Sequence, residues 1–140
     1  MMTSSVAVVL DTNVLLVALP TRSPYRVIFD RLLAAAFELV VSNDILTEYE
    51  EQIAKRYDRE STEDLLAVLG ALPNVRRVTP YFRWQLIVAD PDDDKFVDAA
   101  IAGNAAYLVT NDRHFGVLKT TEFPRVAICT AQEFLRLIDE

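Results

Sequence analysis

The sequence predicts an α/β fold, a single-domain three-layer α/β/α sandwich with a mainly parallel five-stranded sheet. Three observations lead to this prediction. Short apolar runs alternate with segments of helical periodicity along the chain, which is typical of parallel sheets covered by helices. The first run, residues 6–10, is apolar at five successive positions, as expected for a strand buried on both faces. Only three glycines and no biased tract occur in 140 residues, so we expect one domain over residues 1–140.

Each expected strand is a short apolar run that ends in a polar residue or a cap. The predicted strands are residues 6–10, 37–41, 75–78, 107–110 and 126–129. The predicted helices are residues 13–19, 24–36, 43–57, 61–72, 91–103 and 131–138. Ser23–Pro24 and Asp90–Pro91 each provide a cap followed by a proline at the first helical position, and Thr130 with Glu133 forms a capping box. Residues 79–89 have no clear pattern.

The charge of the chain is informative in its sign and in its distribution. The formal net charge is −7, which is the wrong sign for a protein that binds nucleic acid through its overall electrostatic field. Five carboxylates fall between Asp90 and Asp98. This concentration favours a cluster that binds cations over a charge spread only for solubility.

Other features of the sequence point to the cytoplasm. No apolar run approaches the roughly 20 residues that a membrane-spanning helix needs, so we expect no membrane association. Residues 1–5 lack basic side chains, and we therefore expect no signal peptide. The lone Cys129 excludes an internal disulfide and suits a reducing compartment, where it would serve packing.

The predicted topology brings distant carboxylates to one edge of the sheet. Asp11 follows the first strand and Asp112 the fourth, and the ends of parallel strands share an edge. Glu48 lies in the helix that leaves the second strand at that edge. The helix of residues 91–103 runs back toward the sheet, so its first turn, residues 92–94, starts at the same edge. Asp98 shares a helix face with Asp94, four residues before it.

Each carboxylate also has an ordinary structural interpretation. Asp11 could cap the following helix, and Asp112 could form a turn. Glu48 and Asp98 could be solvated helix acids, whereas Asp92 and Asp93 mainly suit the helix dipole. Four carboxylates at one edge are harder to explain in this way. Oxygen ligands of this kind suit Mg²⁺ or Mn²⁺, not zinc.

Four motifs in this order resemble a known family. They are Leu-Asp-Thr-Asn at residues 10–13, Ile-Leu-Thr-Glu at 45–48, Asp-Pro-Asp-Asp-Asp-Lys at 90–95 and Leu-Val-Thr-Asn-Asp at 108–112. The set resembles the PIN domain, and within it the prokaryotic VapC-like toxin components of type II toxin–antitoxin systems. The resemblance implies a Mg²⁺- or Mn²⁺-dependent endoribonuclease with an RNA substrate, a cognate antitoxin partner and a homodimer. The family's acidic residues map onto Asp11, Glu48, Asp94 and Asp112, since the spacing to the apolar helix favours Asp94 over Asp92 and Asp93.

The mechanism that follows is metal-assisted hydrolysis of an RNA phosphodiester. Asp11 and Asp94 would bind the principal metal, and Asp112 and Glu48 would complete the site. Supporting positions are Asn13, Thr110 and Asp98. Arg22, Arg26, Arg113 and Lys119 could hold RNA phosphates or be solvated surface residues. His114, the lone histidine, is expected to be a polar surface residue.

Two alternatives come from other classes of protein. A phosphatase with an aspartyl nucleophile also places an aspartate after the first strand, but it usually needs a second acid two residues later, where this chain has Asn13. A regulatory α/β domain could bind Mg²⁺ without turning over a substrate. Cleavage of labelled RNA distinguishes the nuclease from both.

Overall fold

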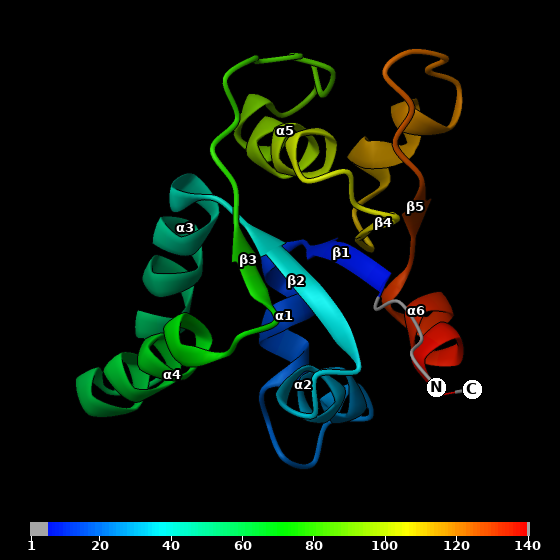
Figure 1. The fold of residues 1–140 in the computed structure, drawn as a ribbon. Coiled ribbons are helices and arrows are strands. Elements are labelled where there is room, and N and C mark those ends of the chain that lie inside the picture. The colour runs from blue at the N-terminus through cyan, green and yellow to red at the C-terminus, as the bar shows by residue number, and fades with distance from the viewer. Residues whose placement is uncertain (1–5, 140) are drawn as a thin grey trace.

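The computed structural model describes residues 6–139 and contains the predicted parallel sheet (Figure 1). The strands are β1 (Val6–Leu10), β2 (Phe37–Val41), β3 (Val75–Arg77), β4 (Tyr107–Val109) and β5 (Ile128–Cys129). Their order across the sheet is β3-β2-β1-β4-β5, and every neighbouring pair is parallel. The expectation of no signal peptide concerns residues 1–5, which lie outside the described residues.

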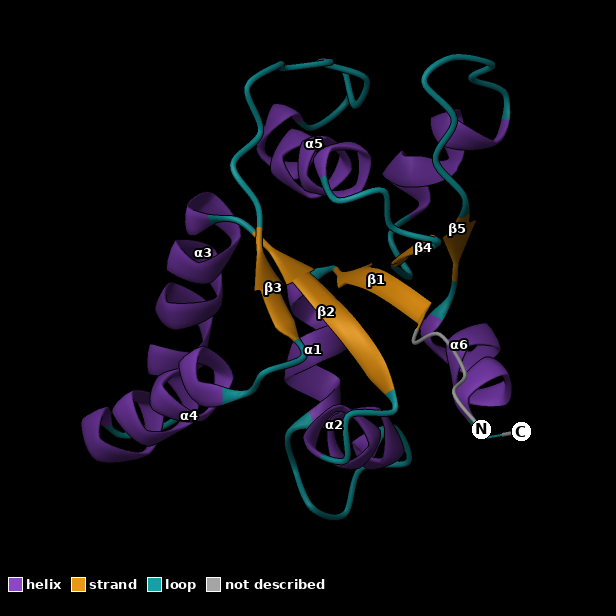
Figure 2. Cartoon of the chain, viewed as in Figure 1, coloured by secondary structure: helices purple, strands orange, loops and turns teal. Residues whose placement is uncertain are grey.

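Helices cover both faces of this sheet, as the α/β prediction requires (Figure 2). They are α1 (Thr12–Ala18), α2 (Arg26–Leu33), α3 (Asn43–Ala54), α4 (Arg59–Ala71), α5 (Asp94–Ala102) and α6 (Ala131–Ile138). Two 3₁₀ segments, η1 (Pro91–Asp93) and η2 (Arg113–Lys119), complete the elements. α5 packs on one face against β1, β2 and β4, whereas α1 and α2 lie on the opposite face, with α6 beside α2 (Figure 1).

The central strand explains why the core forms where it does. Val8, Val9 and Leu10 of β1 have no exposed surface, because strands on both sides and helices on both faces cover them. Gly103, at the end of α5, lets that helix approach β2 closely. A Cβ atom at this position would lie 2.7 Å from Cγ1 of Val40, so any side chain here would displace the helix or the valine.

Several helix boundaries differ from the sequence prediction for local reasons. The helix predicted from Ser61 begins at Arg59, because Asp58 caps it by accepting the Ser61 N–H at 2.8 Å. The helix predicted for residues 24–36 starts at Arg26 and ends before Ala35, whose φ of 59° is left-handed. The helix predicted for residues 91–103 splits into η1 and α5. The last helix matches, with its capping box between Thr130 and Glu133.

Two findings bear on the environment of the protein. Within residues 6–139, no helix is both long enough and apolar enough to span a bilayer. The Cys129 thiol is buried in β5, and burial raises its pKa to about 11. The burial and the raised pKa of the thiol agree with the role in packing expected for Cys129.

Candidate functional site

The ends of β1 and β4 hold Asp11 and Asp112 together through a shared threonine. Asp11 is only 5% exposed, and although it precedes α1, its side chain accepts a hydrogen bond from the Thr110 hydroxyl at 2.8 Å. The same hydroxyl oxygen accepts the Asp112 N–H at 3.0 Å. Thr110 therefore fixes both aspartates at one sheet edge, as the topology predicted.

Glu48 reaches this edge from α3. Its Oε2 accepts a hydrogen bond from the Thr12 hydroxyl, and its Oε1 accepts one from Lys95 Nζ at 2.5 Å. The next residue, Tyr49, is fully buried and donates its hydroxyl to the Leu10 carbonyl at 2.6 Å. The middle of α3 is thus attached to the last residue of β1, directly before Asp11.

Among the three consecutive aspartates, Asp93 is the one connected to the strand ends, because one of its carboxylate oxygens lies within 4.8 Å of a ring nitrogen of His114, and His114 contacts Asp112. Asp93 Oδ2 is buried and has no hydrogen-bond partner among residues 6–139. Burial, followed by the charges of Asp90, Asp11, Asp112 and Glu48, raises the Asp93 pKa to about 7. We call Asp11, Glu48, Asp93 and Asp112 the acidic centre.

Asp94, the position that the spacing favoured, points elsewhere. Its Oδ1 accepts the Ile87 N–H at 2.8 Å, so it holds the irregular segment of residues 79–89 against α5. The prediction of Asp94 goes with one continuous α-helix that begins at Pro91. The chain instead makes the tighter 3₁₀ turn η1 before α5 begins, which changes the residue that faces the strands.

The electrostatics of the acidic centre are those of like charges held close together. Burial raises the pKa of Asp11, and the charges of Asp112 and Glu48 add to this effect. Hydrogen bonds from Thr110 and from the Thr12 backbone lower the pKa and offset part of the shift. Such a group is stabilised by a cation more than by any further hydrogen bond.

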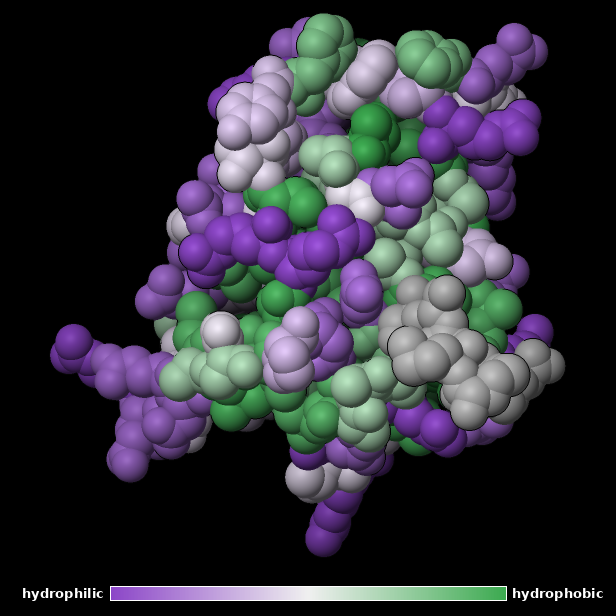
Figure 3. Space-filling model, in the orientation of Figure 1, coloured by the Kyte–Doolittle hydropathy of each residue, from purple (hydrophilic) through white to green (hydrophobic). Residues whose placement is uncertain are grey.

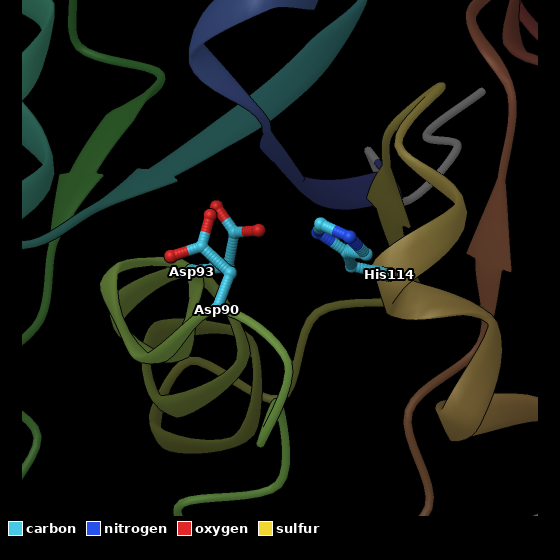
Figure 4. A group of neighbouring side chains, drawn as sticks. All are labelled: Asp90, Asp93 and His114. Carbon is cyan, nitrogen blue, oxygen red and sulfur yellow. The ribbon is translucent and has the colours of Figure 1, made fainter.

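Two residues that the sequence analysis did not choose lie at the rim of this centre. Asp90, Asp93 and His114 each bring a potential ligand atom within 4.8 Å of the others (Figure 4). His114 Nδ1 also lies 3.5 Å from Asp112 Oδ1. Their positions in the sequence could have indicated this proximity to the acidic centre, because His114 comes two residues after Asp112 and Asp90 comes three residues before Asp93.

The remaining predicted positions divide between the two ends of α1. Arg26 forms an ion pair with Asp30 and donates to the Leu19 carbonyl, about 12 Å along α1 from Asp11. Arg22 is exposed in the turn between α1 and α2. The expectation that these two arginines lie near the carboxylate edge is therefore wrong, since the chain has turned to the far end of the helix.

The four other predicted positions differ in where they lie. Arg113 and Lys119 are exposed on η2, which starts directly after Asp112. Asn13 is exposed in the first turn of α1. Asp98 is buried on α5 and accepts the Trp84 N–H at 3.0 Å, so it anchors residues 79–89 together with Asp94.

A cleft of about 340 Å³ lies between part of this segment and the first residues of η1 and α5. Pro80, Arg83 and Gln85 line it on one side, and Asp92 and Lys95 line it on the other. Lys95 therefore lies between the cleft and the acidic centre.

Three aromatic side chains cluster between residues 79–89 and the loop that contains Phe123. Phe82 and Trp84 lie 4.4 Å apart between ring centroids, and Phe123 packs edge-on against Trp84 at 5.8 Å. Phe82 and Phe123 are 60% and 81% exposed, and apolar side chains break the polar surface over the two upper loops in Figure 3.

Residues 7–114 match a family model described as the PIN domain, and this span includes every member of the acidic centre. The chain belongs to the PIN domain family. No curated protein matches the chain in sequence. The α/β fold and the PIN resemblance drawn from the four motifs are both confirmed.

Solved structures share the fold of this PIN domain at low sequence identity. One is VapBC2 from Rickettsia felis bound to a DNA fragment from their promoter, with a TM-score of 0.61 and 19% identity over 89% of this chain and 98% of that chain. Another is FitAcB from Neisseria gonorrhoeae, with a TM-score of 0.55 and 17% identity over the same shares. At these identities the likeness establishes the fold alone.

Proposed function

We propose that this PIN domain is a metal-dependent endoribonuclease. The observation that supports the proposal is the acidic centre. Thr110 binds both Asp11 and Asp112 at the ends of β1 and β4. The charges of Asp11, Asp112 and Glu48 all act on the carboxyl group of Asp93. A buried Asp93 oxygen without a hydrogen-bond partner among residues 6–139 leaves room for a ligand in that centre. Membership of the PIN family and the predicted motif set support the same activity.

The donor atoms fit a hard divalent cation. Carboxylate oxygens of Asp11, Asp93 and Asp112 suit Mg²⁺ or Mn²⁺, and the nearby His114 nitrogen would favour Mn²⁺ of the two. We therefore replace Asp94 by Asp93 among the proposed site residues and keep Asp11 and Asp112 as ligands, with Glu48 beside them.

The residues of this chain would each have a distinct task. A bound divalent cation supplies an activated water and stabilises negative charge on the phosphate. Asp11, Asp93 and Asp112 would hold that cation. Thr110 would keep Asp11 and Asp112 in place through its two hydrogen bonds. Of the predicted phosphate contacts, Arg113 and Lys119 remain candidates because η2 adjoins the acidic centre.

Cleavage of labelled single-stranded RNA tests the proposal. We expect cleavage with Mg²⁺ or Mn²⁺, none with EDTA, and none from Asp11→Asn. Asp58→Ala, a matched change at a helix cap remote from the centre, should leave cleavage unchanged. Cleavage in EDTA, or by Asp11→Asn, would refute the scheme. Release of phosphate from small esters without RNA cleavage would favour the phosphatase, and metal binding without turnover the regulatory domain.

We further propose that the chain is the toxin of a toxin–antitoxin pair in the cytoplasm, with a cognate antitoxin as its partner. The VapC-like motif order and the fold shared with VapBC2 support this proposal. Co-expression with the product of the adjacent reading frame should give a stable complex that does not cleave RNA. Independent growth arrest without any inhibitory neighbour would contradict it. The proposed homodimer predicts twice the chain mass in light scattering.

A further inference from the structure

Lys95 is a positively charged group built into the acidic centre. Its side chain is only 19% exposed, and its Nζ lies 2.5 Å from Glu48 Oε1 and 4.0 Å from Asp92 Oδ1. The other Glu48 oxygen accepts the Thr12 hydroxyl. Both oxygens of Glu48 are therefore already engaged by donors from the chain.

The opposite side of the acidic centre is different. Asp93 Oδ2 is buried without a hydrogen-bond partner in the described part of the chain, and Asp11 accepts a side-chain hydrogen bond only from Thr110 among those residues. Asp93 also feels the charges of Asp11 and Asp112. Asp112 Oδ1 accepts the His114 N–H at 2.8 Å, but within residues 6–139 no lysine or arginine forms an ion pair with Asp11, Asp93 or Asp112. The negative charge that lacks a lysine or arginine partner is thus concentrated on these three aspartates, away from the Lys95–Glu48 pair.

Two divalent cations in one site need carboxylates for both, held about 4 Å apart. Asp90 and His114, the other potential ligands, lie beside Asp93 on the side of the first cation. Glu48 is the member of the acidic centre that remains for a second cation, and the Lys95 ammonium already contacts it. A second divalent cation would have to displace this ammonium or approach it closely against charge repulsion. Lys95 with one divalent cation offsets three of the four negative charges.

We propose that the ammonium of Lys95 takes the place of a second metal ion, so that the acidic centre binds one divalent cation on its Asp11, Asp93 and Asp112 side. This inference rests on the proposed metal-dependent function. Lys95 is then a positioning residue, which holds Glu48 and limits the number of bound ions.

Titration with Mn²⁺, followed by the electron paramagnetic resonance signal of the free ion, measures that number directly. At about pH 8, where the carboxylates are ionised, we expect one Mn²⁺ per wild-type chain. Lys95→Gln and Lys95→Met, which remove the charge, should each bind two. Lys95→Arg, which keeps the charge, should bind one, and so should Lys55→Gln, a control at an exposed lysine. Circular dichroism establishes that each variant is folded.

The outcomes separate this inference from the proposed function. Two Mn²⁺ ions per wild-type chain would overturn the role of Lys95 but leave the nuclease intact. One Mn²⁺ per chain in both folded neutral variants would overturn it as well. If neither neutral variant folds, the wild-type count together with that of Lys95→Arg decides. No Mn²⁺ bound by the wild type would refute the metal-dependent nuclease itself.

Discussion

Carboxylates in this protein occupy two contrasting environments. Asp58 and Glu133 lie at helix N-termini on the surface, where hydrogen bonds from Ser61 and from the Thr130 backbone lower their pKa values. Asp11 and Asp93 lie at the carboxyl ends of the strands, where burial and neighbouring negative charges raise theirs. The same chemical group is therefore stabilised in its charged form at the caps and destabilised in that form at the acidic centre.

This contrast separates the acids that stabilise the fold from the acids to which we assign metal binding. At a cap, the chain itself supplies the donors that a carboxylate needs. At Asp11 and Asp93 the donors do not offset burial and the neighbouring negative charges, so these two acids oppose folding in the absence of a cation. Binding of a cation by the folded state alone then stabilises the protein by mass action.

The largest expected effect sharpens the contrast at the level of activity. Asp93→Asn should reduce RNA cleavage more than about 100-fold, because losses up to that size already follow from residues that only support metal ligands. Asp94→Asn, one position along, should retain most activity, since Asp94 holds the Ile87 N–H instead. Single-turnover cleavage rates of the two variants show whether Asp93 or Asp94 is the metal ligand. Equal losses in both variants would restore Asp94 to the ligand set.

A smaller effect is expected from the threonine behind the two strand-end aspartates. Thr110→Val keeps the shape of the side chain but removes its hydrogen bonds to Asp11 and Asp112. We expect Mn²⁺ affinity to fall about 10-fold, within the range for groups that orient metal ligands. Thr121→Val, at a half-buried threonine on another segment whose hydroxyl donates to the Val117 carbonyl, is the control. Unchanged Mn²⁺ affinity in Thr110→Val would show that these bonds do not position the ligands.

The pH dependence of stability should also distinguish the two environments. The folded Asp93 pKa of about 7 exceeds its ordinary value of 3.8, so the folded chain binds this proton more tightly than the unfolded chain. The resulting stability is fully present below pH 3.8 and is lost as the pH rises through about 7. The depressed pKa values of the cap acids act in the opposite sense, since their stability is lost as the pH falls through those values.

Melting of the metal-free protein should accordingly become easier between about pH 5 and pH 8. Solvent screens a half-buried group, so we expect a fall of a few degrees in Tm, the size that about 1 kcal/mol produces in such a domain. Asp93→Asn should flatten this part of the curve and raise the Tm at the higher pH. A wild-type Tm that rises over this interval would contradict the assignment.

The smallest effect is expected at a cap. Asp58→Ala removes the acceptor for the Ser61 N–H and should lower the Tm by a few degrees at neutral pH. RNA cleavage and Mn²⁺ binding should stay unchanged. A loss of Mn²⁺ binding in this variant would remove the distinction between the two sets of acids.

Topology was predictable from the sequence because it depends on patterns that repeat. The five apolar runs gave the strands, and the parallel arrangement then required Asp11 and Asp112 to share an edge. The choice between Asp93 and Asp94 was not predictable in this way. A single 3₁₀ turn at residues 91–93 changes which carboxylate faces the strands, and the spacing of apolar residues in α5 does not reveal that turn.

Contacts between residues that are distant in the sequence were the other feature that could not be predicted. Lys95 and Glu48 are 47 positions apart, and no local pattern identifies their ion pair. Arg26 was placed at the wrong end of the molecule because the sequence shows a turn after α1 but not its direction. Tertiary geometry decides these cases.

The attachment of residues 79–89 has a consequence for how such a protein can diversify. Residues 79–89 are attached to α5 by backbone N–H groups that donate hydrogen bonds to Asp94 and Asp98. Backbone donors are present whatever side chains the segment carries, so its aromatic and basic residues can be exchanged while the anchoring remains. For the proposed nuclease, a new RNA preference can therefore arise by substitution within residues 79–89, without any change in the acidic centre.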